Sequence, residues 1–213
     1  MEADGRAAAE PLIAMGSDLL LLDSGMAAAE KAAICKAARV ARESPFVIAI
    51  GKNIGVGVDI DGSVRKPTTA ADAEKIVDSC IRSQLPTRVL IVDDSSTMRG
   101  IVRKILSASK FPLEVADTDD GLRALLELRG GKFEMVFLDC NMPGFDGFEI
   151  LSELRRLQPH VVVVMMTSTE DSAVAERARK AGASACLKKP FFPADIDALL
   201  YRLHKIEPPR RTA

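Results

Sequence analysis

The feature that most constrains the fold is a regular alternation of short apolar runs and helical patterns between Gln84 and His204. The runs are rich in β-branched residues, as is typical of strands, and the segments between them place apolar residues at helical spacing. Five strands are predicted, at residues 87–92, 113–116, 135–138, 161–166 and 185–187, each followed by a helix. The six consecutive apolar residues at 161–166 indicate a strand that is buried on both faces. We therefore predict an α/β fold with a five-stranded, doubly wound parallel sheet.

Residues 1–83 align with the rest of the chain as an incomplete second copy. A shift of 116 positions places Asp23 on Asp139, and a shift of 123 places Lys66 on Lys189. The copy starts at its second helix, so its first strand, first helix and second strand have no counterpart. We predict a truncated, degenerate domain at 1–83, a linker at 84–87, a complete domain at 88–206 and a flexible tail at 207–213.

The missing strand has a structural consequence for the incomplete copy. Without it, the apolar run Leu19–Leu22 becomes an edge strand, and an apolar edge promotes aggregation unless it is covered. Three covers remain open: a preceding segment, if Met1 is an internal residue; the C-terminal domain; or another chain, as in a homodimer formed through residues 1–83.

Charge and cysteine content exclude several classes of protein. The chain has 29 basic and 30 acidic residues and a net charge of −1, so no overall field favours nucleic acid or an anionic membrane. Its four cysteines are far apart and lack metal-ligand spacing, which indicates reduced thiols in the cytoplasm. No apolar run approaches the roughly 18 residues that cross a bilayer. We expect a cytoplasmic protein that binds neither nucleic acid nor a membrane.

Polar residues stand where the predicted strands stop. Asp93 and Asp94 follow the first strand, Asp139 the third, Thr167 the fourth and Lys189 the fifth. Strand carboxyl ends form the ligand-binding edge of an open α/β sheet, so these side chains should converge. Three converging carboxylates repel one another and favour a hard cation such as Mg²⁺. Asp139 could then attack a phosphoryl group whose charge is met by Mg²⁺, Lys189 and the Thr167 hydroxyl.

Four motifs in this order resemble the receiver domain of two-component response regulators, the CheY-like proteins. They are Val92-Asp93-Asp94-Ser95, the segment from Asp139 through Met142-Pro143-Gly144 to Asp146-Gly147, Thr167-Ser168, and Lys189-Pro190-Phe191. The resemblance covers about residues 86–206 and implies a flavodoxin-like sheet of order 2-1-3-4-5.

The resemblance also implies residue roles. Asp139 would accept a phosphoryl group from the phosphohistidine of a histidine kinase or phosphotransfer protein. Asp94 would bind Mg²⁺ directly, Asp93 largely through water, and Asn141 through its backbone carbonyl. Thr167 would follow the phosphate, and Lys189 would pair with it.

The sequence departs from the receiver pattern in two places. Cys186 stands where the family usually carries a Tyr or Phe that turns inward as the hydroxyl moves, so the output switch is expected to be altered. In the incomplete copy, Asp23 and Lys66 stand at the acceptor and lysine positions, but the acid pair and the hydroxyl are absent. We predict that Asp23 is not appreciably phosphorylated.

These observations predict a response regulator that signals by contact with a downstream protein target. Only seven residues follow 206, so no DNA-binding output domain is expected in this chain. The chain would not be an enzyme beyond catalysing its own Mg²⁺-dependent phosphorylation and dephosphorylation. Two alternatives are a scaffold whose site is not phosphorylated, and a phosphohydrolase that forms an aspartyl phosphate. The latter would require a second aspartate where Asn141 stands.

Overall fold

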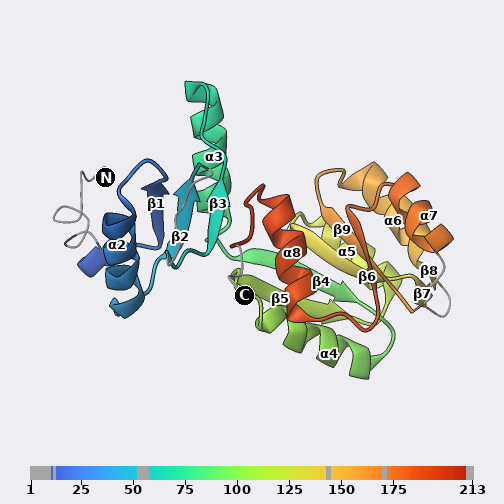
Figure 1. The fold of residues 1–213 in the computed structure, drawn as a ribbon. Helices are drawn as coiled ribbons and strands as arrows, with labels where there is room; N and C mark the ends of the chain where they lie inside the picture. Colours follow the sequence, from blue (N-terminus) through green and yellow to red (C-terminus); the bar gives the residue numbers. More distant parts are fainter. Residues whose placement is uncertain (1–10, 12, 52–57, 143–144, 169–171, 210–213) are drawn as a thin grey trace. The chain divides into compact units, whose positions relative to one another are not determined.

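The structure is a computed structural model that describes residues 11, 13–51, 58–142, 145–168 and 172–209 (Figure 1). The chain forms two compact units. The first comprises Met1–Leu85 together with Leu200–Ala213, and the second comprises Pro86–Leu199. Each unit is described by itself.

The second unit contains a five-stranded parallel sheet. Its strands are β4 (Thr87–Val92), β5 (Leu113–Thr118), β6 (Met135–Asp139), β9 (Val162–Thr167) and β10 (Ala185–Lys188). The order across the sheet is β5-β4-β6-β9-β10, which confirms the predicted order 2-1-3-4-5. The central strands β4, β6 and β9 carry the most apolar runs because helices cover both of their faces.

Helices follow the strands and cover both faces of this sheet. They are α4 (Ser96–Ser107), α5 (Gly121–Arg129), α6 (Gly147–Leu157), α7 (Ser172–Lys180) and α8 (Pro193–Leu203). Buried residues of α5, α6 and α7 share one core cluster with the sheet, and α4 and α8 lie on the opposite face (Figure 1). The side chains of Ser95, Asp120 and Asp146 cap the helices that follow them, as is typical of helix starts.

Two features of the second unit differ from the prediction. Strand β5 extends to Thr118, two residues beyond the predicted end, and its polar residue Asp117 pairs with Ile91. An edge strand tolerates such residues because one of its sides faces solvent. A short antiparallel pair, β7 (Asn141–Met142) with β8 (Phe145–Asp146), was not predicted. Pro143 and Gly144 of the quoted motif lie outside the described residues.

The first unit contains a three-stranded parallel sheet of order β1-β2-β3, with helices α2 (Ala28–Val40) and α3 (Ala70–Arg82). Its strands are β1 (Leu19–Asp23), β2 (Phe46–Ile50) and β3 (Gly62–Val64). As predicted, the leucine run is an edge strand, paired only with β2 among the described residues. Residues 58–61 form no helix, and 52–57 lie outside the described part of the chain.

The end of the chain belongs to the first unit. Ser63 and Glu207 form an antiparallel bridge, with N to O distances of 2.8 and 2.7 Å in the two directions. The Tyr201 hydroxyl donates to the carbonyl of Asp61 at 2.6 Å. The segment predicted as a flexible tail, 207–213, therefore begins with a residue that is hydrogen-bonded to β3.

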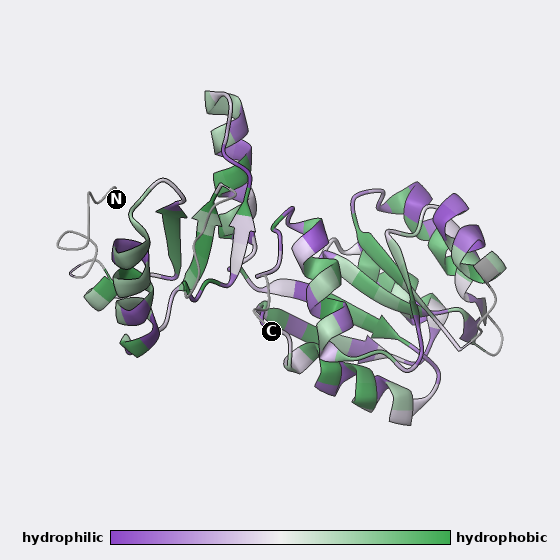
Figure 2. Ribbon diagram, viewed as in Figure 1, coloured by the Kyte–Doolittle hydropathy of each residue, from purple (hydrophilic) through white to green (hydrophobic). Residues whose placement is uncertain are grey.

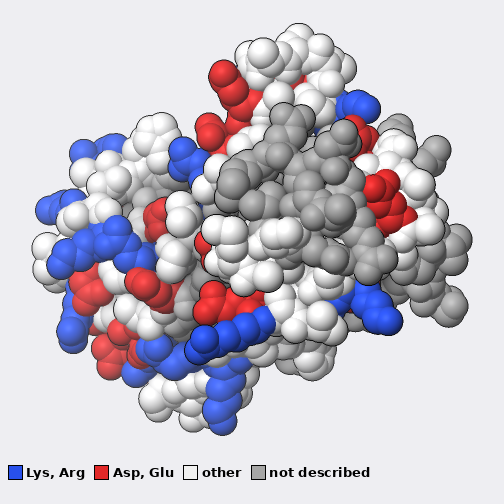
Figure 3. Space-filling model, turned by 90° about the vertical axis from the view of Figure 1, so that its left-hand side faces the viewer, with Lys and Arg blue, Asp and Glu red and all other residues white. Residues whose placement is uncertain are grey.

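Hydropathy and charge follow these elements. Most strands of the two sheets are hydrophobic, β3 is paler, and several helices carry hydrophilic residues along one side (Figure 2). On the face shown in Figure 3, basic and acidic side chains are interspersed rather than gathered into regions of one sign. Among the described residues, no helix is both long enough and apolar enough to cross a membrane.

Candidate functional site

Three carboxylates meet at the carboxyl edge of the five-stranded sheet. Asp93 directly follows β4, Asp94 comes next in the chain, and Asp139 is the last residue of β6. One oxygen of each lies within 4.8 Å of the others. Asp93 and Asp139 are 1% and 7% exposed, whereas Asp94 is exposed to solvent. The strand order brings these residues together because β4 and β6 are neighbours in the sheet.

Lys189 joins this cluster from the end of β10. Its Nζ donates to Asp93 Oδ2 at 2.7 Å and to Asp139 Oδ1 at 2.9 Å, and its side chain is 9% exposed. The backbone N–H of Lys189 donates to the carbonyl of Thr167 at 2.7 Å, which holds the lysine beside the end of β9. Its neighbour Lys188 is exposed.

Burial and pairing shift the pKa values of the two central groups. Burial raises the pKa of Asp139 above its usual range, and the negative charges of Asp93 and Asp94 add to this, against the opposing effect of Lys189. Burial would lower the pKa of Lys189, but its hydrogen bonds to Asp93 and Asp139 outweigh burial and raise it. Lys189 thus stays an ammonium, and its single positive charge does not neutralise all the negative charge of the surrounding carboxylates.

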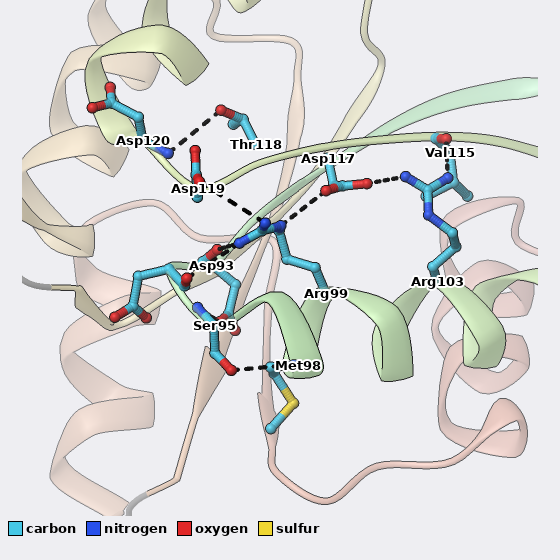
Figure 4. A network of polar contacts seen from close by, with 11 residues as sticks. Asp93, Ser95, Met98, Arg99, Arg103, Val115, Asp117, Thr118, Asp119 and Asp120 are labelled. Atoms are coloured by element: carbon cyan, nitrogen blue, oxygen red, sulfur yellow. Dashed lines mark hydrogen bonds and ion pairs between the residues drawn. The ribbon is translucent and has the colours of Figure 1, made fainter.

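The acid pair lies in a tightly bonded turn between β4 and α4 (Figure 4). The backbone N–H of Ser95 donates to Asp93 Oδ1 at 3.0 Å, and the Ser95 hydroxyl accepts from the N–H of Met98 at 3.3 Å. Asp93 therefore uses one carboxylate oxygen in the turn and the other with Lys189. The orientation of the Asp93 carboxylate is therefore set by its hydrogen bonds to the turn before α4 and to Lys189 after β10.

Thr167 and Asn141 flank the cluster. Thr167 is the last residue of β9 and is 4% exposed. The register places Met166 opposite Asp139, so Thr167 lies one residue further toward the same edge. Asn141 is exposed and starts β7. The roles given to these residues by the resemblance, and those of Asp93, Asp94, Asp139 and Lys189, stay predictions.

Two cysteines lie near the acceptor position. Cys186 is half-buried on β10, opposite Met165, and packs against the core cluster that contains Cys140. Burial, with a smaller contribution from Cys186, raises the pKa of the Cys140 thiol to about 12. Cys140 thus stays protonated and has the character of a buried filler rather than of a redox-active thiol.

Two residues at the site were given no role in the sequence analysis. At Gly147, the first residue of α6, a Cβ would lie 2.2 Å from the carbonyl oxygen of Asp139. At Arg99, in the first turn of α4, the guanidinium contacts the backbone of Asp93 and Asp94. A cation near a helix N-terminus opposes the helix dipole. A basic residue at this position is therefore the sequence feature that could have drawn attention to Arg99.

The corresponding positions of the first unit form a simpler site. Lys66 Nζ lies 3.4 Å from Asp23 Oδ2, and both side chains are more than half exposed. The backbone N–H of Gly25 donates to Asp23 Oδ1 at 2.7 Å, and this bond is the main cause that lowers the pKa of Asp23. Within the described ranges, the cluster of Asp93, Asp94 and Asp139 is the one group of acids that could hold a metal.

The cluster fits a hard divalent cation. Three carboxylates supply the oxygen ligands that Mg²⁺ prefers, and the exposure of Asp94 leaves room for the waters that Mg²⁺ keeps.

An apolar pocket of about 260 Å³ lies beside Lys189, between α4 and the segment that follows β10. Its lining residues are Met98, Ile101, Val102, Ile105, Lys189, Pro190 and Phe191.

Comparison with known proteins supports the resemblance to receiver domains. Residues 89–201 match the family described as the response regulator receiver domain. "Chemotaxis protein CheY-3" of Vibrio cholerae is 36% identical over 118 residues, which are 54% of this chain and 90% of that protein. The "Cyclic di-GMP phosphodiesterase response regulator RpfG" of Xanthomonas campestris is 32% identical over 119 residues, 55% of this chain but only 32% of that protein.

A solved structure agrees with this result. The response regulator domain of CheB from Thermotoga maritima matches with a TM-score of 0.51 and 25% identity, over 58% of this chain and 100% of that one. The strand order, the acidic edge of the sheet and the sequence match lead to one conclusion. The chain belongs to the family of response regulator receiver domains, the CheY-like proteins of two-component signalling.

Proposed function

We propose that this chain accepts a phosphoryl group on Asp139 in a Mg²⁺-dependent reaction and passes the signal on by protein contact. The observation that carries the proposal is the placement of Asp139. Its carboxylate is nearly buried, shares a site with two other carboxylates and lies 2.9 Å from the ammonium of Lys189. In this proposal Asp93, Asp94 and the backbone carbonyl of Asn141 hold the metal.

The chemistry follows from these contacts. A carboxylate oxygen of Asp139 attacks phosphorus, a new O–P bond forms, and the P–N bond of a phosphohistidine breaks. Asp139 Oδ1 accepts from Lys189, so Oδ2 is the oxygen we assign as nucleophile. Lys189 and the Thr167 hydroxyl then pair with phosphoryl oxygens. Bound Mg²⁺ would neutralise the remaining phosphoryl charge.

The decisive experiment uses a small donor. The full chain is incubated with acetyl phosphate and Mg²⁺, and its intact mass is recorded for the wild type, Asp139→Asn and Asp23→Ala. We expect the mass of one phosphoryl group on the wild type and on Asp23→Ala, none on Asp139→Asn, and none with EDTA. An unmodified wild type would refute the proposal and favour the unphosphorylated scaffold. A phosphate that is present on Asp139→Asn and absent from Asp23→Ala would assign the acceptor to the first unit.

The proposed partners are a histidine kinase or phosphotransfer protein as donor and a downstream protein as target, all in the cytoplasm. We propose domains at 1–83 and 88–206. The first domain is not itself phosphorylated, and two copies of the chain could form a homodimer through it.

Cys186 and Thr167 form the proposed switch. With Mg²⁺ and beryllofluoride, we expect NMR shift changes at Thr167 that do not extend along β10. Large changes along β10 would contradict an altered switch.

A further inference from the structure

The guanidinium of Arg99 contacts the backbone of the acid pair (Figure 4). Its Nη1 donates to the carbonyl of Asp93 at 2.8 Å and to that of Asp94 at 3.2 Å. Its Nε donates to Asp117 Oδ2 at 2.9 Å, and its Nη2 lies 3.9 Å from Asp119 Oδ2. The Arg99 side chain is 15% exposed. One guanidinium thus joins the end of β5 to the backbone of both acidic residues.

The anchor of Arg99 is itself held in place. Asp117 Oδ1 pairs with Arg103, whose Nη1 also donates to the carbonyl of Val115 at 2.6 Å. Burial would raise the pKa of Asp117, but the hydrogen bonds from Arg103 and Arg99 outweigh it and lower the pKa. Asp117 therefore remains a carboxylate. A cation in the first turn of α4 opposes the helix dipole, and Asp117 with Asp119 offsets that cost.

We propose that Arg99 is a positioning residue that fixes the backbone of Asp93 and Asp94 so that their carboxylates are pre-arranged for the cation. The inference rests on the proposed Mg²⁺ site. The two carboxylates repel each other and Asp139, so a turn whose carbonyls lose their hydrogen bonds from Arg99 would relax and separate them. Metal binding would then have to restore the turn. The planar fork of Arg99 donates to two carbonyls and a carboxylate from separate nitrogens, whereas Lys offers one compact ammonium.

The charge of Arg99 alone predicts the opposite effect on Mg²⁺ affinity. A cation near three carboxylates repels Mg²⁺, so removing it should tighten metal binding if charge were its only contribution. Arg103 provides the matched control. It carries the same charge and pairs with the same Asp117, but its guanidinium donates to Val115 and Asp117 rather than to the acid pair.

The first measurement is the Mg²⁺ dissociation constant by calorimetry on the full chain, for the wild type, Arg99→Gln, Arg99→Lys and Arg103→Gln. We expect Arg99→Gln to bind about tenfold more weakly, as is typical when a group that orients metal ligands is lost. Arg99→Lys should lie between it and the wild type, and Arg103→Gln should bind at least as tightly as the wild type. Equal or tighter binding by Arg99→Gln would overturn the inference, as would equal weakening by Arg103→Gln.

The second measurement needs no metal. The N–H of Ser95 is bonded to Asp93 Oδ1 inside the turn, so its hydrogen exchange reports the order of the turn. We expect faster exchange in metal-free Arg99→Gln, partial restoration in Arg99→Lys and no change in Arg103→Gln. Unchanged exchange in Arg99→Gln overturns the inference. If the wild type binds no Mg²⁺, the proposed function fails together with the inference; if it binds and Arg99→Gln matches it, only the inference fails.

Discussion

At the scale of single residues, one ammonium faces three carboxylates. Lys189 contacts Asp93 and Asp139 directly, and Asp94 faces solvent on the same edge. The pKa of Asp139 stays above its usual range even with Lys189 in contact. Without a metal, the site therefore carries excess negative charge. The effect of this charge can be measured as a change in the free energy of unfolding.

Replacing Asp139 by Asn should stabilise the metal-free protein at neutral pH. Because the pKa of Asp139 is raised above 3.8 in the folded state, the folded state binds the proton more tightly than the unfolded state. Stability is then lost as pH rises through the folded pKa. Urea unfolding with EDTA should show Asp139→Asn more stable than the wild type at about pH 7, with a difference that narrows toward about pH 4. A wild type that is the more stable protein at neutral pH would contradict this.

Removing the ammonium should have the opposite effect. Lys189→Met should lower the free energy of unfolding of the metal-free protein by about 3 kcal/mol, because it leaves buried carboxylates without their counter-ion. The raised pKa of Lys189 keeps this contribution fully present below its unfolded value of 10.5, and it is lost only as pH rises through the folded pKa. Lys188→Met, at the exposed neighbour, should change stability by less than about 0.5 kcal/mol. Added Mg²⁺ should restore part of the loss in Lys189→Met, and equal effects of the two variants would rule out the counter-ion role.

At the scale of elements, the site depends on how closely helices approach strand ends. Helix α6 begins so near the end of β6 that a Cβ at Gly147 would meet the Asp139 carbonyl at 2.2 Å and the Cα of Cys140 at 3.1 Å. Both neighbours are backbone, which cannot move aside without displacing the end of β6. In α4, by contrast, a Cβ at Gly100 would meet nothing within 4 Å.

The two glycines should respond to alanine in opposite directions. Gly147→Ala should destabilise the protein by roughly 2–3 kcal/mol through overpacking. Gly100→Ala should stabilise it by about 0.5–1 kcal/mol, because an exposed helical glycine loses more backbone entropy on folding than alanine. Urea unfolding of the two variants against the wild type measures both changes. Stabilisation by Gly147→Ala would show that the approach of α6 to β6 is looser than described.

At the scale of the whole molecule, the end of the chain completes the first unit rather than standing free. Glu207 pairs with Ser63 of β3, and Tyr201, which is 4% exposed, donates to Asp61. A Cβ at Gly62 would lie 2.5 Å from Cγ2 of Ile206, so glycine allows this close approach. The short strand β3 is thereby bonded on both edges, to β2 and to the chain end.

Tyr201→Phe should loosen this segment without affecting the phosphorylation site. The loss of one hydrogen bond to a partly buried carbonyl should reduce the local stability by about 1 kcal/mol. Hydrogen exchange of the Ser63 amide, which donates to Glu207, should accelerate by roughly fivefold, the equivalent of that energy. Mg²⁺ affinity should match the wild type. Unchanged exchange at Ser63 would show that the Tyr201 bond does not hold the segment.

Sequence reasoning predicted the elements and the convergence of the site for one physical reason. Strands buried on both faces must be almost continuously apolar, so β4, β6 and β9 are visible as runs, and the polar residues that end them must meet at one edge. A different argument, that the incomplete copy has no counterpart of the central strand, correctly placed Leu19–Leu22 at the edge of its sheet. Sequence reasoning missed the β7–β8 pair and the last two residues of β5, where short or polar segments leave no apolar pattern.

The sequence by itself determined the alternation of strands and helices and the residues that stand at the strand ends, and its resemblance to receiver domains supplied the strand order. Only the tertiary structure decided that Arg99 holds the carbonyls of Asp93 and Asp94, that Gly147 touches the backbone of Asp139, and that Glu207 pairs with Ser63. The reason is that hydrophobic periodicity reports burial, which each segment carries locally. A hydrogen bond to a carbonyl or a backbone approach of a few ångströms depends on where separate elements pack, and no local pattern records it.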